Sequence, residues 1–387
     1  MDKIQDILTR GVDEVIDKDN LESLLRSKKK LRIKLGIDPT SPNIHIGRAG
    51  ALWKLRAFQE LGHTAIFIVG DFTGMIGDTS DKESERPMLS EKEVKANGVG
   101  YFEQAYKILD KKKTEVYYNS KWLKKLGFLE LAKMSNLFGL HQFASREVIA
   151  RRMKADQRVS YLELMYPIMQ GYDSVAVKAD VELGGTDQRF NLLTGRDIQK
   201  FYKQPPQDII MLQLLEGIDG RKMSSSWGNV INLTDEPNNM FGKVMSVPDS
   251  LIKKYFVLAT RVEIKEIDEI IKLPNPRDQK IILGEKITEL YHGGKKALSA
   301  KQAFVSQFSK GDLPQDISVK KMPTGKYPLV DLLVETKLAS SKSEARRLVD
   351  QNGVKINSQT AKEQIVEVDG KSEYLLQVGK RKFLKIK

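Results

Sequence analysis

The sequence predicts an α/β fold whose core is a Rossmann-like parallel sheet with a helical insertion, followed by an α-helical domain and a small α+β domain. Three observations predict the sheet. Residues 31–37 alternate apolar and other side chains in the manner of a strand. Residues 49–61 carry apolar side chains at helical spacing before Gly62, which suits the end of a helix. The short apolar run 64–69 predicts a buried strand, and the three elements in this order form a β-α-β unit.

Two polar segments are placed to bind phosphate. The first, residues 38–48, contains His45 and Gly47 where the carboxyl end of the first strand meets the amino terminus of the helix. Unpaired backbone N–H groups and the helix dipole favour a phosphate at such a junction. The second, residues 220–226, is a cationic, hydroxyl-rich loop around Lys222. Each segment alone is more often a turn or a solvated loop, so the prediction depends on their occurring together.

A polar helix face provides a third candidate binding region. Tyr166, Gln170 and Asp173 stand at i, i+4 and i+7, which places them on one face of a helix. Many such faces are simply solvated. The neighbours of these residues are largely apolar, however, and indicate a buried helix. Buried polar groups need partners, and a ligand can supply them.

The two phosphate-binding segments together resemble the signatures of class I aminoacyl-tRNA synthetases. The family's first signature ends in two histidines flanking Ile-Gly, and its second is Lys-Met-Ser-Lys-Ser; here Arg48 replaces the second histidine and Ser225 the second lysine. The resemblance implies a catalytic group made of His45, Arg48, Lys222, Ser225 and Ser226. It also implies that ATP is bound by Gly36, Asp38, Thr40, His45, Gly47, Gly185, Asp187, Lys222 and Ser225.

Residues 166–173 and 180–188 are similar to segments of tyrosyl-tRNA synthetases, and the likeness extends over essentially the whole chain. It implies that Tyr166, Gln170 and Asp78 hold the α-ammonium group of tyrosine, and that Asp173 accepts a hydrogen bond from the phenol. Gln188 would lie close to the substrate. Lys34 stands where many bacterial relatives place a second tyrosine, so it is included among the tyrosine-binding residues while the second phenol partner stays open.

Composition limits the cofactors and the compartment. The chain of 387 residues has no cysteine, and its four histidines are scattered, so the sequence suggests no structural metal. ATP is expected as a substrate accompanied by Mg²⁺, with no tightly bound cofactor. The first 30 residues mix acidic and basic side chains unlike a signal or transit peptide, and no apolar run approaches the length of a membrane span. We therefore expect a cytoplasmic protein.

The order of predicted strands, helices and breaks divides the chain into four regions. Residues 1–235 are expected to form the catalytic domain, including a helical insertion at about 115–165 through which, by the resemblance, tyrosine enzymes form homodimers. Residues 236–312 are expected to form an α-helical anticodon-side domain, residues 313–325 a linker, and residues 326–387 a separate unit. An ordinary packed helix pair would give the same periodicity as the insertion.

The last unit resembles the small RNA-binding domain first recognised in a ribosomal small-subunit protein. Ser341 is predicted to cap a helix that carries Lys342, Arg346 and Arg347 away from its apolar face, and these three are the candidate RNA-binding residues. A further basic cluster lies at 380–382. The formal net charge of +13 also favours a polyanionic partner, although a general lysine bias would produce it too.

These predictions combine into a tyrosine–tRNA ligase reaction with L-tyrosine, ATP and tRNA(Tyr) as partners. Two alternatives stay open on the sequence. One is another class I adenylate-forming enzyme, such as a tryptophan–tRNA ligase or a nucleotidyltransferase with the same first signature. The other is a non-catalytic RNA-binding protein on a synthetase scaffold, against which stands the joint presence of Asp78, Asp173 and Asp187.

Overall fold

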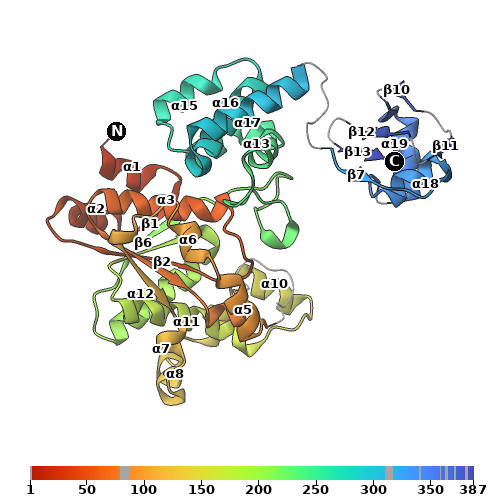
Figure 1. The fold of residues 1–387 in the computed structure, drawn as a ribbon. Coiled ribbons are helices and arrows are strands. Elements are labelled where there is room, and N and C mark those ends of the chain that lie inside the picture. The colour runs from red at the N-terminus through yellow and green to blue at the C-terminus, as the bar shows by residue number, and fades with distance from the viewer. Residues whose placement is uncertain are drawn as a thin grey trace. The chain divides into compact units, whose positions relative to one another are not determined.

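The structure is a computed structural model that describes residues 2–78, 88–309, 317–339, 341–357, 359–361, 365–369, 372–379 and 382–387. The chain divides into two compact units, residues 1–301 and 302–387, each taken by itself below (Figure 1). The first four residues of the predicted linker, 313–316, and the first two of the basic cluster, 380–381, lie outside the described residues. Within the described ranges, no helix is both long enough and apolar enough to cross a membrane.

The first unit is built on a six-stranded sheet, in the order β1-β6-β5-β2-β3-β4. The strands are β1 (Val12–Ile16), β2 (Arg32–Ile37), β3 (Thr64–Val69), β4 (Thr114–Tyr118), β5 (Val181–Gly185) and β6 (Asp208–Leu212). All neighbours pair in parallel except β1 and β6, which are antiparallel. The predicted parallel sheet is therefore confirmed. The antiparallel edge strand β1 was not predicted, because its half-buried residues follow no clear alternation.

The strand order reverses direction between β2 and β5. The chain runs outward from β2 to β3 and β4, and then returns to place β5 and β6 on the other side of β2. In an open parallel sheet, the crevice for a ligand lies at such a switch point, beyond the carboxyl ends of the strands. The ends of β2 and β5, near Gly36 and Gly185, therefore form the expected binding edge.

Helices cover both faces of this sheet (Figure 1). On one face, α3 (Ile46–Glu60) packs on alternate strand residues such as Leu35 and Phe67. On the other face, Ile66 and Met211 pack under α11 (Tyr161–Val177) and α12 (Arg189–Phe201) respectively. Helices α11 and α12 approach closely at two glycines, since a Cβ on Gly171 would lie 3.1 Å from the Cα of Gly195.

The remaining helices of this unit are short except α16, with 17 residues, and α17, with 16, whose last residues belong to the second unit. They are α1 (Lys3–Thr9), α2 (Lys18–Arg26), α4 (Thr73–Ile76), α5 (Glu91–Gly98), α6 (Tyr101–Ala105), α7 (Ser120–Leu123), α8 (Phe128–Ser135), α9 (Leu140–Ala144), α10 (Glu147–Lys154), α13 (Pro237–Met245), α14 (Ile252–Ala259), α15 (Ile264–Ile271), α16 (Pro276–His292) and α17 (Gly294–Ser309). Residues 114–118, expected at the start of the helical insertion, form the strand β4 instead, because β3 offers them a free edge. Helices α13 to α16 share their apolar core with α3.

The second unit has its own core and a small sheet in the order β10-β9-β12-β13-β7, beside a separate pair β8 and β11. Its elements are β7 (Val319–Lys320), β8 (Gly325–Pro328), α18 (Leu329–Glu335), α19 (Lys342–Asp350), β9 (Val354–Ile356), β10 (Gln359–Thr360), β11 (Ile365–Val368), β12 (Tyr374–Val378) and β13 (Lys382–Ile386). The prediction that Ser341 caps α19 is confirmed, since its hydroxyl accepts from the Glu344 N–H at 3.2 Å. Lys342, Arg346 and Arg347 are exposed on α19, and Lys342 pairs with Asp331 at 2.7 Å.

Candidate active site

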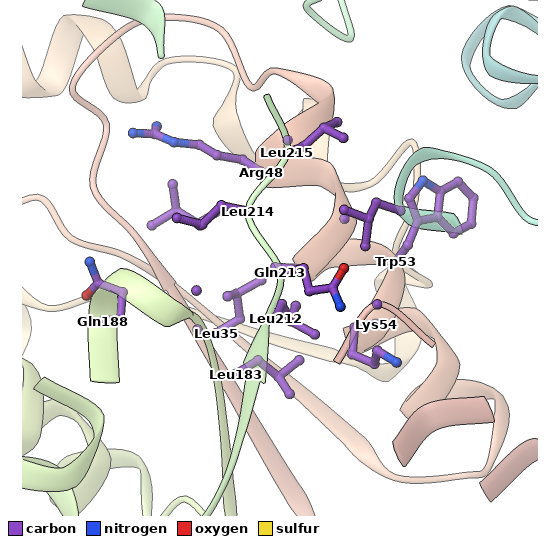
Figure 2. Close-up of a pocket in the computed structure, with 18 of the residues that line it drawn as sticks. Leu35, Arg48, Trp53, Lys54, Leu183, Gln188, Leu212, Gln213, Leu214 and Leu215 are labelled. Atoms are coloured by element: carbon purple, nitrogen blue, oxygen red, sulfur yellow. The ribbon is translucent and has the colours of Figure 1, made fainter. Parts of the chain in front are cut away.

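A cavity of about 760 Å³ opens at the carboxyl ends of β2 and β5. Every residue predicted from the sequence to act in catalysis, ATP binding or tyrosine binding lines it; these are Lys34, Gly36, Asp38, Thr40, His45, Gly47, Arg48, Asp78, Tyr166, Gln170, Asp173, Gly185, Asp187, Gln188, Lys222, Ser225 and Ser226. Figure 2 shows Leu35, Leu183 and Leu212 together at its floor, from three adjacent strands. The predicted RNA-binding residues belong to the other unit.

Gly36 keeps the floor of the cavity open. It lies within β2, between two hydrogen-bonded neighbours, and yet it is exposed. A Cβ built on Gly36 would meet no atom within 4 Å, so the missing side chain leaves space where a ligand can approach the strand. A larger residue here would fill the crevice at the switch point.

The first signature forms the amino terminus of α3. His45 is the N-cap residue, and its Nδ1 accepts a hydrogen bond from the Arg48 N–H at 3.3 Å. Burial, with help from the charges of Arg48 and Lys222, lowers the pKa of His45 to about 3, so the imidazole is neutral at physiological pH. Because Nδ1 is an acceptor, the ring proton is on Nε2, which can donate to an anion in the cavity.

Arg48 holds the loop that follows β2. Its guanidinium donates to the carbonyl of Asp38 at 3.3 Å, to the hydroxyl of Thr40 at 3.2 Å and to the hydroxyl of Tyr101 at 3.2 Å. Tyr101 in turn donates to the carbonyl of Ser41 at 2.8 Å. The arginine that replaces the second signature histidine therefore orders residues 38–41. Sequence reasoning missed Tyr101, because nothing local to it marks a contact with a loop 60 residues away.

The second signature lies against the first. The Lys222 ammonium forms an ion pair with Asp187 at 2.7 Å, and the hydroxyl of Ser41 donates to that of Ser225 at 3.1 Å. Residues 225–227 form a short 3₁₀ turn. The structure thus brings together two segments 180 residues apart, as their phosphate-binding character predicted, and places the cation of the second on a carboxylate predicted to bind ATP.

The end of the cavity that is predicted to bind a phenol is centred on Asp173. This buried carboxylate accepts from the indole N–H of Trp122 at 2.7 Å and from the amide of Asn119 at 3.2 Å. Burial raises the pKa of Asp173 to about 7, while Lys34 and these two donors oppose the rise. Trp122 belongs to α7 and Asn119 precedes it, and neither was identified from the sequence, since an ordinary aromatic and an ordinary asparagine carry no periodic signal.

Lys34 lies beneath this end and is fully buried. Its ammonium contacts Glu182 at 2.8 Å, the carbonyl of Gln170 at 2.9 Å and the hydroxyl of Ser174 at 2.8 Å. An ammonium has three donors, and these contacts use all of them. Lys34 therefore supports the helix that carries Gln170 and Asp173, and its assignment to the tyrosine-binding residues stays a prediction.

The ammonium end is rich in acceptors. The Tyr166 hydroxyl donates to Asp38 at 2.8 Å, and burial raises the pKa of Asp38 to about 6. Asp38, which the resemblance assigns to ATP, thus directly contacts a predicted tyrosine-binding residue. Asp78 accepts from the amide of Gln188 and, at 3.4 Å, from the amide of Asn191. Asn191 also donates to Gln170 at 3.1 Å and was not predicted, because it stands outside every recognised segment.

Comparison with known proteins agrees with this geometry. A family model described as tRNA synthetases class I (W and Y) matches residues 26–309, and one described as a tyrosine–tRNA ligase SYY-like C-terminal domain matches residues 309–386. The chain is 45% identical to the tyrosine–tRNA ligase of Thermotoga maritima over 98% of this chain and 96% of the relative. It is 43% identical to that of Shewanella oneidensis over 100% and 98% of the two chains.

Solved structures share the fold. A tyrosyl-tRNA synthetase from Archaeoglobus fulgidus, complexed with L-tyrosine, superposes with a TM-score of 0.61 at 24% identity, covering 76% of this chain and 98% of that one. A C-terminally truncated mitochondrial tyrosyl-tRNA synthetase from Coccidioides posadasii gives a TM-score of 0.64 at 23% identity, covering 78% and 91%. At these identities the likeness establishes the fold alone.

The chain belongs to the class I aminoacyl-tRNA synthetases, in the group that acts on tryptophan and tyrosine. Within that group its family is that of the tyrosine–tRNA ligases, because the relatives that match it over nearly its full length carry that name and residues 309–386 match a model of their C-terminal domain. The predicted family and α/β fold are thereby confirmed.

Proposed function

We propose that this chain joins L-tyrosine to ATP, forming tyrosyl-adenylate and pyrophosphate, and then transfers the tyrosyl group to tRNA(Tyr) in the cytoplasm. One observation carries the proposal: a single cavity has a buried carboxylate, Asp173, at one end and both phosphate-binding signatures at the other. A ligand that spans the cavity presents a hydroxyl to Asp173 and a triphosphate to His45 and Lys222.

Tyrosine is oriented by its two polar ends. Its phenol donates to Asp173, whose other hydrogen bonds come from Trp122 and Asn119. Its ammonium group lies among the oxygens of Asp78, Gln170 and the Tyr166 hydroxyl. These contacts direct the carboxylate of the substrate toward the junction of β2 and α3, where ATP binds.

The chemical step needs no general base. The tyrosine carboxylate is ionised at neutral pH, so one of its oxygens attacks the α-phosphorus while the bond from that phosphorus to the pyrophosphate oxygen breaks. Negative charge then develops on the departing pyrophosphate. The Nε2–H of His45, the ammonium of Lys222 and the hydroxyls of Ser225 and Ser226 are the donors for that charge.

Mg²⁺ supplies charge neutralisation when it arrives with ATP. Among the described residues, no three acidic or histidine side chains gather as a metal site, so the phosphate oxygens are the expected ligands. The protein's own part is the ordering of the loop at residues 38–41 by Arg48, which sets the entrance to the triphosphate position.

A homodimer explains the apolar surface of the helices between β4 and β5. Phe128, Leu129, Leu140 and Tyr161 are 87%, 70%, 67% and 73% exposed. Helices α7 and α8 project from the rest of the unit (Figure 1). Clustered apolar side chains of this size mark an interaction surface, and a second copy of the chain is the proposed occupant. Phe128→Asp should shift the protein toward the monomer in sedimentation.

The second unit is proposed to bind tRNA through α19. Arg346 and Arg347 are exposed cations one residue apart, suited to neighbouring phosphates, while Lys342 is already paired with Asp331. Contacts between these arginines and tRNA phosphates would strengthen tRNA binding, and this contribution would fall as the salt concentration rises. They should therefore contribute to the charging of tRNA and not to adenylate formation.

Tyrosine-dependent exchange of pyrophosphate into ATP tests the proposal. The exchange should proceed with tyrosine and be far weaker with phenylalanine and tryptophan. Equal exchange with tryptophan would contradict the proposal that Asp173 recognises the tyrosine hydroxyl. The absence of exchange with any amino acid would favour a non-catalytic protein.

Truncation after residue 309 tests the second unit. The first unit has its own core, so exchange should persist, whereas charging of tRNA(Tyr) should fall sharply. A double substitution of Arg346 and Arg347 by alanine should weaken charging in the same direction at constant exchange. Full charging by the truncated chain would show that α19 is only a solvated surface.

A further inference from the structure

The Lys222 segment is held in a hairpin by backbone hydrogen bonds. Its backbone closes through the Met223 N–H to the Leu215 carbonyl at 2.9 Å and the Gly217 N–H to the Arg221 carbonyl at 2.7 Å. The base is fixed to α14, since the Tyr255 hydroxyl donates to the Glu216 carbonyl at 2.6 Å. These bonds give the segment around Lys222 a defined backbone path.

Asn229 clamps this hairpin on both sides of Lys222. Its side chain is buried, and its Oδ1 accepts from the Ser224 N–H at 2.9 Å. Its Nδ2 donates to the Lys222 carbonyl at 3.1 Å and to Asp219 Oδ1 at 2.7 Å. One amide side chain thus bonds the carbonyl of Lys222 and the N–H of Ser224, and it ties both to the turn at Asp219.

The hairpin is shaped to receive this side chain. A Cβ on Gly217 would lie 2.3 Å from the Asn229 carbonyl oxygen and 2.6 Å from its Nδ2, so only glycine leaves room for the amide. Met223 is buried on the opposite side, with its sulfur 3.4 Å from where a Cβ of Gly47 would be. Asn229 and Met223 together fix the backbone of Lys222 against the amino terminus of α3.

We propose that Asn229 is a positioning residue that acts through Lys222 in adenylate formation. A lysine side chain is long and flexible, so the position of its Cα decides which phosphate oxygens its ammonium reaches. Misplacement by about 1 Å can cost on the order of 10²-fold in rate. Without Asn229, the Lys222 carbonyl and the Ser224 N–H lose their partners, and the hairpin is free to shift. The inference rests on the proposed function.

A double-mutant cycle tests the inference. Single-turnover adenylate formation is measured for the wild type, Asn229→Ala, Lys222→Ala and the double variant, with tyrosine affinity measured at equilibrium. Asn229→Ala should slow the step by roughly 10–10²-fold with tyrosine affinity unchanged. In the Lys222→Ala background, Asn229→Ala should lower the rate of adenylate formation by less than about threefold. The effects of the two substitutions are not additive if Asn229 acts through Lys222.

The controls separate positioning from general destabilisation. Asn275→Ala removes an exposed asparagine that accepts from a backbone N–H at 3.0 Å at the start of α16, and it should leave the rate unchanged. Asn229→Asp should not rescue, because its carboxylate would face Asp219 and the Lys222 carbonyl. If Asn229→Ala fails to fold, Gly217→Ala is expected to displace the amide and show the same coupling with Lys222→Ala.

The outcomes distinguish the inference from the proposed function. Additive effects of Asn229→Ala and Lys222→Ala, or a loss of tyrosine affinity equal to the loss of rate, would overturn the positioning role. A wild type without tyrosine-dependent exchange would instead overturn the proposed function. Strong coupling at unchanged tyrosine affinity would establish Asn229 as part of the apparatus that places Lys222.

Discussion

The two ends of the cavity differ in how their charges are paired. At the phenol end, Lys34 and Glu182 form an ion pair whose side chains are 1% and 2% exposed, and Asp173 is held by two donors. At the phosphate end, the side chains of Lys222 and Asp187 are 29% and 18% exposed. The pair at the first end is closed to solvent, whereas the pair at the other end is partly exposed and contains Asp187, which is proposed to bind ATP.

This difference separates recognition from chemistry. Moving a buried, paired group would leave it without its partner at a high cost in free energy. The end of the cavity around Asp173 therefore has a fixed shape, which would favour one substrate side chain over others. An ion pair near solvent contributes little to stability, so the contact between Lys222 and Asp187 is easily exchanged for contacts to ATP. Under the proposed function, the rigid interactions would select the substrate and the weaker ones would take part in the step in which charges move.

The largest effect is expected on the discrimination between tyrosine and phenylalanine, at the end of the cavity around Asp173. Sites built to hydrogen-bond a substrate hydroxyl reject the analogue that lacks it by roughly 10⁴–10⁵-fold, and tyrosine enzymes of this class are themselves the example behind that range. Asp173→Ala should therefore reduce kcat/KM for tyrosine far more than for phenylalanine and shrink their ratio. Asp208→Ala, which removes another buried carboxylate outside the cavity, should leave the ratio intact. A folded Asp173→Ala protein with undiminished tyrosine preference would place the phenol reader elsewhere.

The next effect is on the free energy of unfolding, and it tests how much the buried ion pair of Lys34 and Glu182 contributes. Lys34→Met leaves Glu182 buried without its partner, and breaking such a pair costs about 3–5 kcal/mol of unfolding free energy. Adding Glu182→Gln should restore most of that loss, because it removes the uncompensated charge. Denaturant unfolding of the three proteins makes the measurement. A loss below about 1 kcal/mol for Lys34→Met would contradict the contrast with the phosphate end.

A smaller effect is expected at the open end. Lys222→Ala removes one donor to the developing charge of pyrophosphate, which typically costs about 10²–10³ in rate. Tyrosine affinity should stay nearly the same, because the Lys222 ammonium is paired with Asp187, at the opposite end of the cavity from Asp173. Single-turnover adenylate formation and equilibrium tyrosine binding give the two numbers. An unchanged rate would remove Lys222 from the transition state.

The smallest effect concerns stability and pH. Burial raises the pKa of Asp173 from 3.8 to about 7, so between these values the folded protein holds a proton that the unfolded chain has released. Stability should therefore fall as pH rises through this window. Asp173→Asn removes that penalty and should stabilise the protein by roughly 1–2 kcal/mol at pH 8 and less at pH 5. Denaturant midpoints at both pH values check the sign, and a larger gain at pH 5 would contradict it.

Sequence reasoning located the site well where local patterns encode it. The junction of β2 and α3, the polar face of α11 and the loop of Lys222 each have a spacing that marks them, and the structure brings all three to one cavity. It failed where contacts depend on tertiary placement. Trp122 and Asn119 reach Asp173 from about 50 residues away, and neither belongs to a pattern. Lys34 was assigned by position along the chain, and only its three partners show that it is used beneath the site.

The antiparallel strand β1 covers an edge of the sheet that could otherwise pair with another chain. It is the strand that closes the outer side of β6, whose five residues are all buried and mostly apolar. Without β1, the first unit would present an unpaired apolar edge, which is a template for strand addition by a second chain. Strand β1, which contains none of the proposed catalytic groups, thus covers an edge that could otherwise pair with a strand of a second chain.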